Sequence, residues 1–124
     1  MINLVTAVSR PENLRRIHKS IALSLSRSTL NARWILVVDE ARAITPATEA
    51  LLKEGPFEFK IVLYDGGKSR YGINQKNAGM DSITDGYYHC IDDDNIVHPD
   101  FFQGLERAIR TTPRKRAFAF GQKR

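Results

Sequence analysis

The sequence predicts an α/β fold in which a mostly parallel sheet carries helices on both of its faces. Short apolar runs rich in β-branched residues alternate along the chain with segments whose apolar residues recur at helical spacing. Strands that alternate with helices are joined by right-handed crossovers, which bring the strands into one parallel sheet. In addition, polar residues follow directly after several of the apolar runs, where such sheets bind ligands.

The first strand and the first helix are predicted near the N-terminus. Residues 2–8 are a short, apolar, β-branched run, which indicates a buried strand. Ser9 and Glu12 have the spacing of a capping box, and Pro11 suits the first turn of a helix. The predicted helix has one apolar face, formed by Leu14, Ile17, Ile21 and Leu25.

The remaining elements continue the alternation. Further strands are predicted at residues 34–39, 60–64, 87–91 and 117–120, and further helices at residues 45–52, at residues 73–83 and from Pro99 onward. Gly55 and Pro56 end the second helix, whereas Gly79 lowers the helix propensity of the third. No repeat, linker or low-complexity segment divides the chain, so residues 1–124 are expected to form a single domain.

The composition is that of a globular domain with a basic balance. Of the 124 residues, 42% are hydrophobic and 27% are charged, and the formal net charge is +5. This charge favours anionic partners such as nucleotides, phosphates, nucleic acids or membranes. Five basic residues crowd the C-terminal end: Arg114, Lys115, Arg116, Lys123 and Arg124. We interpret them as a solvated face and tail and do not expect a nucleic-acid partner, since no aromatic residues interleave with them.

The expected compartment is the cytoplasm. No apolar stretch has the length of a transmembrane segment, and no signal peptide follows Met1. Cys90 is the single cysteine, so an internal disulfide is impossible. Its neighbours Tyr87, Tyr88 and Ile91 indicate a thiol buried in a strand and not a reactive one.

Polar residues follow three of the predicted strands. Ser9 and Arg10 come after the first strand, Asp39 ends the second, and Asp92–Asp94 come after the strand at residues 87–91. Because ligands of parallel α/β sheets bind beyond the carboxyl ends of the strands, we expect these groups to converge on one site.

The acidic run Asp92-Asp93-Asp94-Asn95 is the centre of the predicted site. Adjacent carboxylates repel one another and cost stability unless a cation or hydrogen bonds compensate. Oxygen ligands favour Mg²⁺ or Mn²⁺. In an extended chain Asp92 and Asp94 point to one side and Asp93 to the other, so the pair could face a metal–diphosphate. A solvated acidic turn that caps the next helix is the alternative, but the position after an apolar strand favours a ligand site.

The acidic run resembles the Asp-x-Asp motif of GT-A glycosyltransferases. The order of residues 74–79, a strand, the acidic run and then residues 99–101 is similar to family 2 of these enzymes. Residues 9–11, residues 34–39 and the path from residues 75–77 to the acidic run resemble the β-1,3-glucuronosyltransferases of family 43. The resemblance covers nearly the whole chain and implies a Rossmann-like GT-A fold in a short form.

The resemblance also implies roles for individual residues. Asp39 would accept a hydrogen bond from uracil, and Lys76 would lie near the nucleotide where the family usually has an arginine. Asp93 would contact the ribose or the donor sugar. Asp94, together with Asp92, would hold the metal that bridges the diphosphate. The loop after the first strand, including Ser9 and Arg10, would pass near the base and the ribose.

Two features depart from the family pattern. Val8 stands where the glucuronosyltransferases have an aromatic residue, which weakens stacking on the base. The chain also ends soon after Phe120, so the acceptor-binding half is expected to be absent. No catalytic base is identified, because Asp100 and Glu106 are explained by helix capping and solvation.

The predicted function is therefore transfer from a nucleotide-diphosphate sugar, with uridine as the expected base and Mn²⁺ or Mg²⁺ as the cofactor. The acceptor is not predicted, and an oligomer or another subunit would complete the enzyme. One alternative is a binding module without catalysis. A nucleotidyltransferase ranks last, since such enzymes need a glycine-rich basic loop that Arg10 alone does not supply.

Several other residues are candidates for the site. Lys68 and Arg70 could bind the diphosphate, but a solvated loop explains them equally well. His98 is a weak candidate for a second metal ligand because it directly precedes Pro99 at a helix entry. Gly67-Lys68-Ser69 imitates the end of a phosphate-binding loop, but the upstream glycine is missing. His18 and His89 are expected to be structural.

Overall fold

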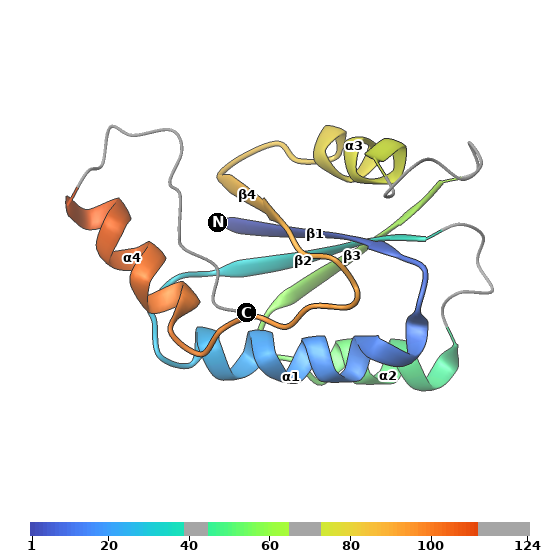
Figure 1. Cartoon of the computed structure of the whole chain (residues 1–124), viewed down its shortest axis with the longest axis horizontal. Coiled ribbons are helices and arrows are strands. Elements are labelled where there is room, and N and C mark those ends of the chain that lie inside the picture. Colours follow the sequence, from blue (N-terminus) through green and yellow to red (C-terminus); the bar gives the residue numbers. More distant parts are fainter. Residues whose placement is uncertain (39–44, 65–72, 112–124) are drawn as a thin grey trace.

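The structure is a computed structural model that describes residues 1–38, 45–64 and 73–111. The elements follow in the order β1 (Ile2–Val8), η1 (Pro11–Asn13), α1 (Leu14–Leu25), β2 (Ala32–Val38), α2 (Pro46–Lys53), β3 (Glu58–Leu63), α3 (Ile73–Asp81), β4 (Tyr87–Cys90) and α4 (Phe101–Thr111). Figure 1 shows α1 and α2 beneath the sheet and α3 above it. None of the helices in the described ranges is long and apolar enough to cross a membrane.

The four strands form one sheet in the order β3-β2-β1-β4, and every pair is parallel. In β1, Ile2 lies opposite Ala32 of β2 and Tyr87 of β4. The predicted fold class is therefore confirmed. The strand order reverses at β1, because the chain first moves outward to β2 and β3 and then crosses to β4 on the other side of β1.

Side chains of the central strands alternate between two cores. Leu4, Trp34 and Leu36 pack with α1 beneath the sheet, and Val5 and Val37 pack with α3 above it. All five are fully buried. This period of two is the geometry of a strand buried on both faces, and it explains why β1 and β2 have near-continuous apolar sequences.

The apolar face predicted for α1 is confirmed, since Leu14, Ile17, Ile21 and Leu25 are all buried. The capping box predicted for its start is wrong. A 3₁₀ turn, η1, precedes α1, and no side chain caps it. The Ser9 hydroxyl instead donates a hydrogen bond to Asp93 Oδ2 over 3.0 Å, because a carboxylate is a stronger acceptor for it than any neutral local partner.

Gly79 allows α3 to approach the sheet closely. A Cβ atom at this position would lie 2.6 Å from Val5 Cγ1 and 2.8 Å from Val37 Cγ2, which is closer than real contacts allow. The glycine that weakens the helix in sequence terms is thus required by packing. It brings α3, and with it Lys76, close to β1 and β2.

Several predicted boundaries shift. Strand β2 begins at Ala32 and β3 at Glu58, two residues earlier than predicted in each case. Helix α4 begins at Phe101, because His98 Nδ1 accepts the backbone N–H of Asp100 and holds the preceding residues in a turn. The strand predicted at residues 117–120 lies outside the described residues.

Candidate functional site

The candidate site lies where β1 and β4 end side by side at the carboxyl edge of the sheet. Ser9 and Arg10 follow β1, and Asp92–Asp94 follow β4 within two residues. In parallel α/β sheets, ligands bind at this edge where the strand order reverses, and here it reverses between β1 and β4. The structure thus brings together two of the three polar groups that the sequence placed at strand ends.

Asp93 is buried, with 6% of its surface exposed, and it fastens the acidic run to the first loop. Its Oδ2 accepts hydrogen bonds from Ser9 N at 2.7 Å, Ser9 Oγ at 3.0 Å and Arg10 N at 2.6 Å. Its backbone oxygen accepts a fourth hydrogen bond from Asn13 Nδ2 at 2.8 Å. We call Ser9, Arg10, Asn13 and Asp93 the Asp93 cluster.

These contacts give Asp93 a structural task that the sequence did not predict. The predicted contact with ribose or sugar would have to use Oδ1, since Oδ2 already accepts three donors. Oδ1 lies 3.7 Å from Arg10 Nη1. Asn13 was not predicted at all, because an asparagine in the first turn before a helix carries no signal for a partner 80 residues away.

Asp92 and Asp94 are exposed, but the extended backbone on which the sequence prediction rested is wrong, because Asp93 and Asp94 lie in a turn in which the Asn95 N–H donates to the Asp92 carbonyl oxygen. Their side chains are 55% and 57% exposed, whereas that of Asp93 is 7% exposed. Each of the two pairs with a cation. Lys76 Nζ lies 2.7 Å from Asp92 Oδ1, and Arg10 Nη1 lies 3.5 Å from Asp94 Oδ2. The site therefore presents two carboxylates and two cations at one edge of the sheet.

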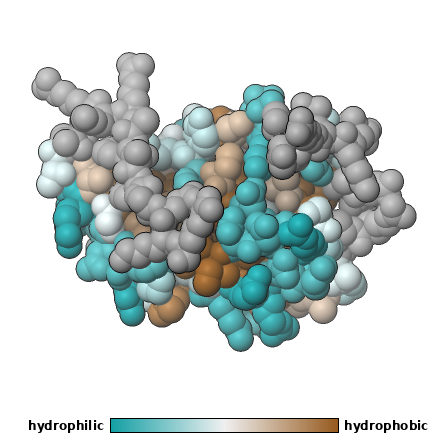
Figure 2. All heavy atoms as spheres, in the orientation of Figure 1, coloured by the Kyte–Doolittle hydropathy of each residue, from teal (hydrophilic) through white to brown (hydrophobic). Residues whose placement is uncertain are grey.

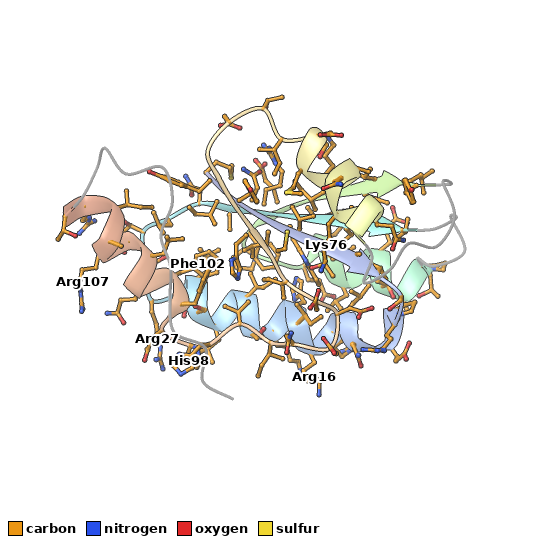
Figure 3. The ribbon with its side chains drawn as sticks, turned by 45° about the horizontal axis from the view of Figure 1, so that its top comes forward. Arg16, Arg27, Lys76, His98, Phe102 and Arg107 are labelled. Atoms are coloured by element: carbon orange, nitrogen blue, oxygen red, sulfur yellow. The ribbon has the colours of Figure 1, made fainter. Side chains whose placement is uncertain are left out.

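Lys76 reaches the site from the face of the sheet that α3 covers. It belongs to α3, its side chain is only 21% exposed, and Figure 3 shows it between α3 and the strands. Arg10 comes from the loop beneath, where it leads into η1. The two cations thus lie on either side of the acidic run, an arrangement that can also hold an anion between them.

The oxygen atoms of the site are an incomplete ligand set for a metal ion. Among the described residues, no group of three His, Cys, Asp or Glu side chains is arranged to hold a cation. Asp92 and Asp94 supply two carboxylates of the kind that Mg²⁺ and Mn²⁺ prefer, and a ligand's phosphate oxygens and water would have to complete the shell.

Three predicted or weighed residues lie outside the described ranges: Asp39, Lys68 and Arg70. The contact between Asp39 and uracil therefore stays a prediction. Val8, which occupies the position of the family's aromatic residue, is 3% exposed and belongs to the core beneath the sheet. Its side chain is not available to stack on a base.

His98 lies away from the acidic run. Its Nδ1 accepts the backbone N–H of Asp100, and Figure 3 places it beside Arg27 at some distance from Lys76. It turns the chain into α4, which leaves the metal-ligand alternative without support.

The remaining titratable groups near the sheet behave as structural residues. Burial raises the pKa of the Cys90 thiol; the nearby Lys76 opposes this effect and Asp92 adds to it. Burial lowers the pKa of His89 and of His18, the latter against the attraction of Glu54. A thiol with a raised pKa is a poor nucleophile at neutral pH, as expected for Cys90.

A groove of about 710 Å³ lies at the opposite, amino-terminal edge of the sheet. Apolar side chains such as Leu25, Leu30 and Phe57 line it, and Glu58 is the one charged side chain among its described lining residues. The groove has room for a ligand, but its described residues do not bring several charged side chains together. Among the described residues, the charged groups that converge lie at the carboxyl edge and not along this groove.

The fold is similar to that of the glycosyltransferase TarS, as seen in a crystal structure of S. aureus TarS 1–349. The TM-score is 0.64 at 11% sequence identity, and the match covers 90% of this chain and 33% of the TarS chain. At this identity the likeness shows the fold alone, which is Rossmann-like and glycosyltransferase-like. No protein-family model and no curated protein matches the chain.

Proposed function

We propose that this chain binds a nucleotide-diphosphate sugar, with uridine as the base, and that it acts in metal-dependent transfer of the sugar. One observation carries the proposal. Asp92 and Asp94 stand exposed at the carboxyl edge of a glycosyltransferase-like fold, while Asp93 is turned inward and holds them in place. This is the arrangement that an Asp-x-Asp motif needs in order to meet a metal–diphosphate.

Asp92 and Asp94 are the residues that would hold the divalent cation. Both side chains are more than half exposed, so a cation can reach them without opening the core. Two carboxylates leave the rest of the coordination shell to water and to the phosphates of the donor, as is usual for Mg²⁺ at nucleotide sites. When bound, such a cation supplies stabilisation of the negative charge on the leaving diphosphate.

Arg10 and Lys76 are the residues that would bind the diphosphate directly. Arg10 Nη1 is 3.7 Å from Asp93 and 3.5 Å from Asp94, so it makes two long contacts and no tight one. A guanidinium held in this way can turn toward a phosphate at little cost. Lys76, at 2.7 Å from Asp92, must exchange a close ion pair for its contact with phosphate or cation.

A binding module without catalysis is the second candidate. Its support is that no described residue after Asp94 is placed as a catalytic base. Asp100 pairs with Arg27, and Glu106 contacts Thr29 and Arg110 at the far end of α1. A donor-hydrolysis assay separates the two candidates, because the module would bind the donor without any turnover.

Thermal unfolding in the presence of uridine diphosphate and Mn²⁺ tests donor binding. A ligand at a hundred times its dissociation constant stabilises the folded state by about 2.7 kcal/mol, which raises Tm by roughly 10 °C in a domain of this size. We expect this shift with both ligands present and a smaller one with either alone. Adenosine and guanosine diphosphates, compared under the same conditions, test the preference for uridine.

Asp94→Asn should abolish the shift, because it removes a charged metal ligand without changing the size of the side chain. Asp100→Asn is the matched control: its carboxylate is 62% exposed and lies in the turn before α4, away from the acidic run, so the shift should persist. A folded protein whose Tm responds to no nucleoside diphosphate would contradict the proposal.

A further inference from the structure

The outer face of α1 is basic in its first half. Arg15, Arg16, Lys19 and Leu23 are exposed and lie on the side of the helix opposite the buried face. The helix contains no acidic residue, and Leu23 is 50% exposed among the cations. We call these four residues the basic face. It is carried by a helix of 12 residues, about 18 Å long, whose other side is fixed in the core.

The charges of the basic face are not neutralised within the described residues. Other basic side chains of the described residues have an acidic partner, such as Arg27 with Asp100 at 3.1 Å and Arg33 with Glu58 at 3.1 Å. Arg15, Arg16 and Lys19 have none within 4.0 Å among the described residues, although the exposed Glu12 lies one turn before them. An array of like charges without counter-charges is unfavourable on its own and favours an anionic partner.

Neighbouring elements extend the same side of the molecule. Figure 3 shows Arg16, Arg27 and Arg107 directed away from the sheet on one side. Figure 2 shows hydrophilic side chains along the lower edge of the molecule, where Figure 1 places α1, with small hydrophobic areas among them. Cations from α1 and α4 therefore face the same side of the molecule.

We propose that the basic face docks on the surface of a lipid bilayer that contains anionic headgroups. Arginine and lysine on an exposed helix face bind such surfaces through the negative surface potential. The exposed leucine decides between a bilayer and a soluble polyanion. A half-exposed apolar side chain among cations gains from the boundary between headgroups and acyl chains, whereas a polyanion in water offers it nothing.

The proposed membrane docking does not depend on the proposed sugar transfer, although the two surfaces are neighbours. The basic face begins next to the candidate site, since α1 starts directly after η1 and the Asp93 cluster. A bilayer beneath α1 would lie along the helix and leave the carboxyl edge of the sheet open at its side. Binding of nucleotide and binding of membrane can thus be measured separately on the same protein.

Co-sedimentation with vesicles tests the proposal on the full chain. We expect binding to vesicles of equal parts phosphatidylcholine and phosphatidylserine, weaker binding at high salt, and little binding to phosphatidylcholine alone. Each basic residue near the surface changes the partition coefficient by about fivefold. Arg16→Glu combined with Lys19→Glu should therefore lower it by at least about twentyfold, and Leu23→Asn by a smaller factor.

Lys19→Glu and Lys60→Glu form a matched pair of single variants with the same change in charge. Lys60 is exposed on β3, where its neighbours Phe59 and Ile61 pack beneath the sheet, so its side chain points to the other face. Lys19→Glu should weaken binding and Lys60→Glu should not. The Arg16 and Lys19 positions are exposed, and a glutamate at position 16 lies in the first turn of the helix, where it is favourable, so circular dichroism should show folded variants.

Three outcomes would overturn the proposal. One is equal binding to neutral and anionic vesicles. Another is an equal loss with Lys60→Glu, or no loss in the double variant, which would assign binding to net charge or to the basic C-terminal residues. The last is binding to soluble polyphosphate, lost in the double variant, without binding to vesicles, which would identify the partner as a polyanion.

Discussion

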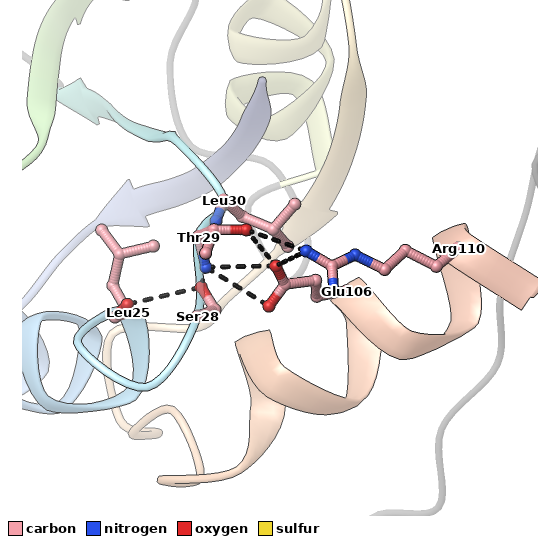
Figure 4. Close-up of polar contacts among 6 residues, drawn as sticks. All are labelled: Leu25, Ser28, Thr29, Leu30, Glu106 and Arg110. Carbon is pink, nitrogen blue, oxygen red and sulfur yellow. Dashed lines mark hydrogen bonds and ion pairs between the residues drawn. The ribbon is translucent and has the colours of Figure 1, made fainter.

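Two carboxylates, at opposite ends of α1, make the same kind of contact in different surroundings. Before the helix, Asp93 accepts both the backbone N–H and the hydroxyl of Ser9. After the helix, Glu106 of α4 accepts both the backbone N–H and the hydroxyl of Thr29, as Figure 4 shows. We call Thr29, Glu106 and Arg110 the Glu106 cluster.

The two clusters differ little in the burial of the carboxylate and more in the nature of the third partner. The Asp93 side chain is 7% exposed and receives another backbone donor, Arg10 N at 2.6 Å. The Glu106 side chain is 12% exposed and receives a side chain from its own helix, Arg110 Nη2 at 3.0 Å, which is itself 70% exposed. Water can therefore replace part of the donors in the Glu106 cluster.

Hydroxyl groups of α1 hold the chain between the two clusters. Ser20 Oγ accepts the backbone N–H of Val97 at 3.0 Å, and Ser24 Oγ accepts that of Phe102 at 3.2 Å. The segment from Asp93 to Glu106 therefore follows α1 along its length. The acidic run is thus oriented by α1 and its preceding loop as much as by β4. The Asp93 cluster fixes the site, and the Glu106 cluster docks α4.

Asp93→Ala is expected to give the largest effect. It leaves the backbone N–H groups of Ser9 and Arg10, and the Ser9 hydroxyl, without the carboxylate that accepts them in a part-buried setting. We expect the free energy of unfolding to fall by about 2 kcal/mol, in line with the loss of hydrogen bonds to a charged acceptor whose donors lie in exposed residues. Urea denaturation at neutral pH measures it.

Asp94→Ala is the control for this comparison, because its carboxylate is 57% exposed and makes one long ion pair. Its effect should stay within about 0.5 kcal/mol, as for most surface changes. Equal losses in the two variants would show that Asp93 is not the structural member of the acidic run.

Removing one hydroxyl from each cluster compares the two carboxylates through smaller losses of stability. Ser9→Ala deletes one of three donors to a buried carboxylate and should cost about 1 kcal/mol. Thr29→Val deletes the matching donor to Glu106, where water and Arg110 remain, and should cost about 0.5 kcal/mol or less. The same denaturation measurement compares them, and a larger loss for Thr29→Val would reverse the assigned ranking.

Local sequence patterns predicted the elements and the outward pair of the acidic run, but not the contacts between distant segments. The apolar runs and the spacing of Leu14 to Leu25 are local signals. The exposed positions of Asp92 and Asp94 were predicted from an extended chain, whereas the structure has a turn there and Asp93 faces inward because it accepts hydrogen bonds from Ser9 and Arg10. Ser9 was assigned to a local cap because its true partner is 84 residues away. Gly79 likewise looked unfavourable in a helix. The reason for a glycine at this position is the close approach to β1 and β2, which only the tertiary fold brings about.

The smallest predicted effect is the change in the stabilising contribution of Glu106 with pH. The hydrogen bond from the Thr29 hydroxyl is the main cause that lowers the pKa of Glu106 below its ordinary value of 4.5, with the Thr29 N–H and Arg110 adding to it and burial opposing it. A lowered folded-state pKa stabilises the protein above about pH 4.5, and this contribution is lost as the pH falls through the folded-state value. Glu106→Gln should therefore lower Tm by about 1 °C at neutral pH, and its gap to the unchanged protein should close in acid. Thermal unfolding across this range checks it, and a gap that stays constant down to the lowest pH would show that the Glu106 cluster holds α4 by shape and not by charge.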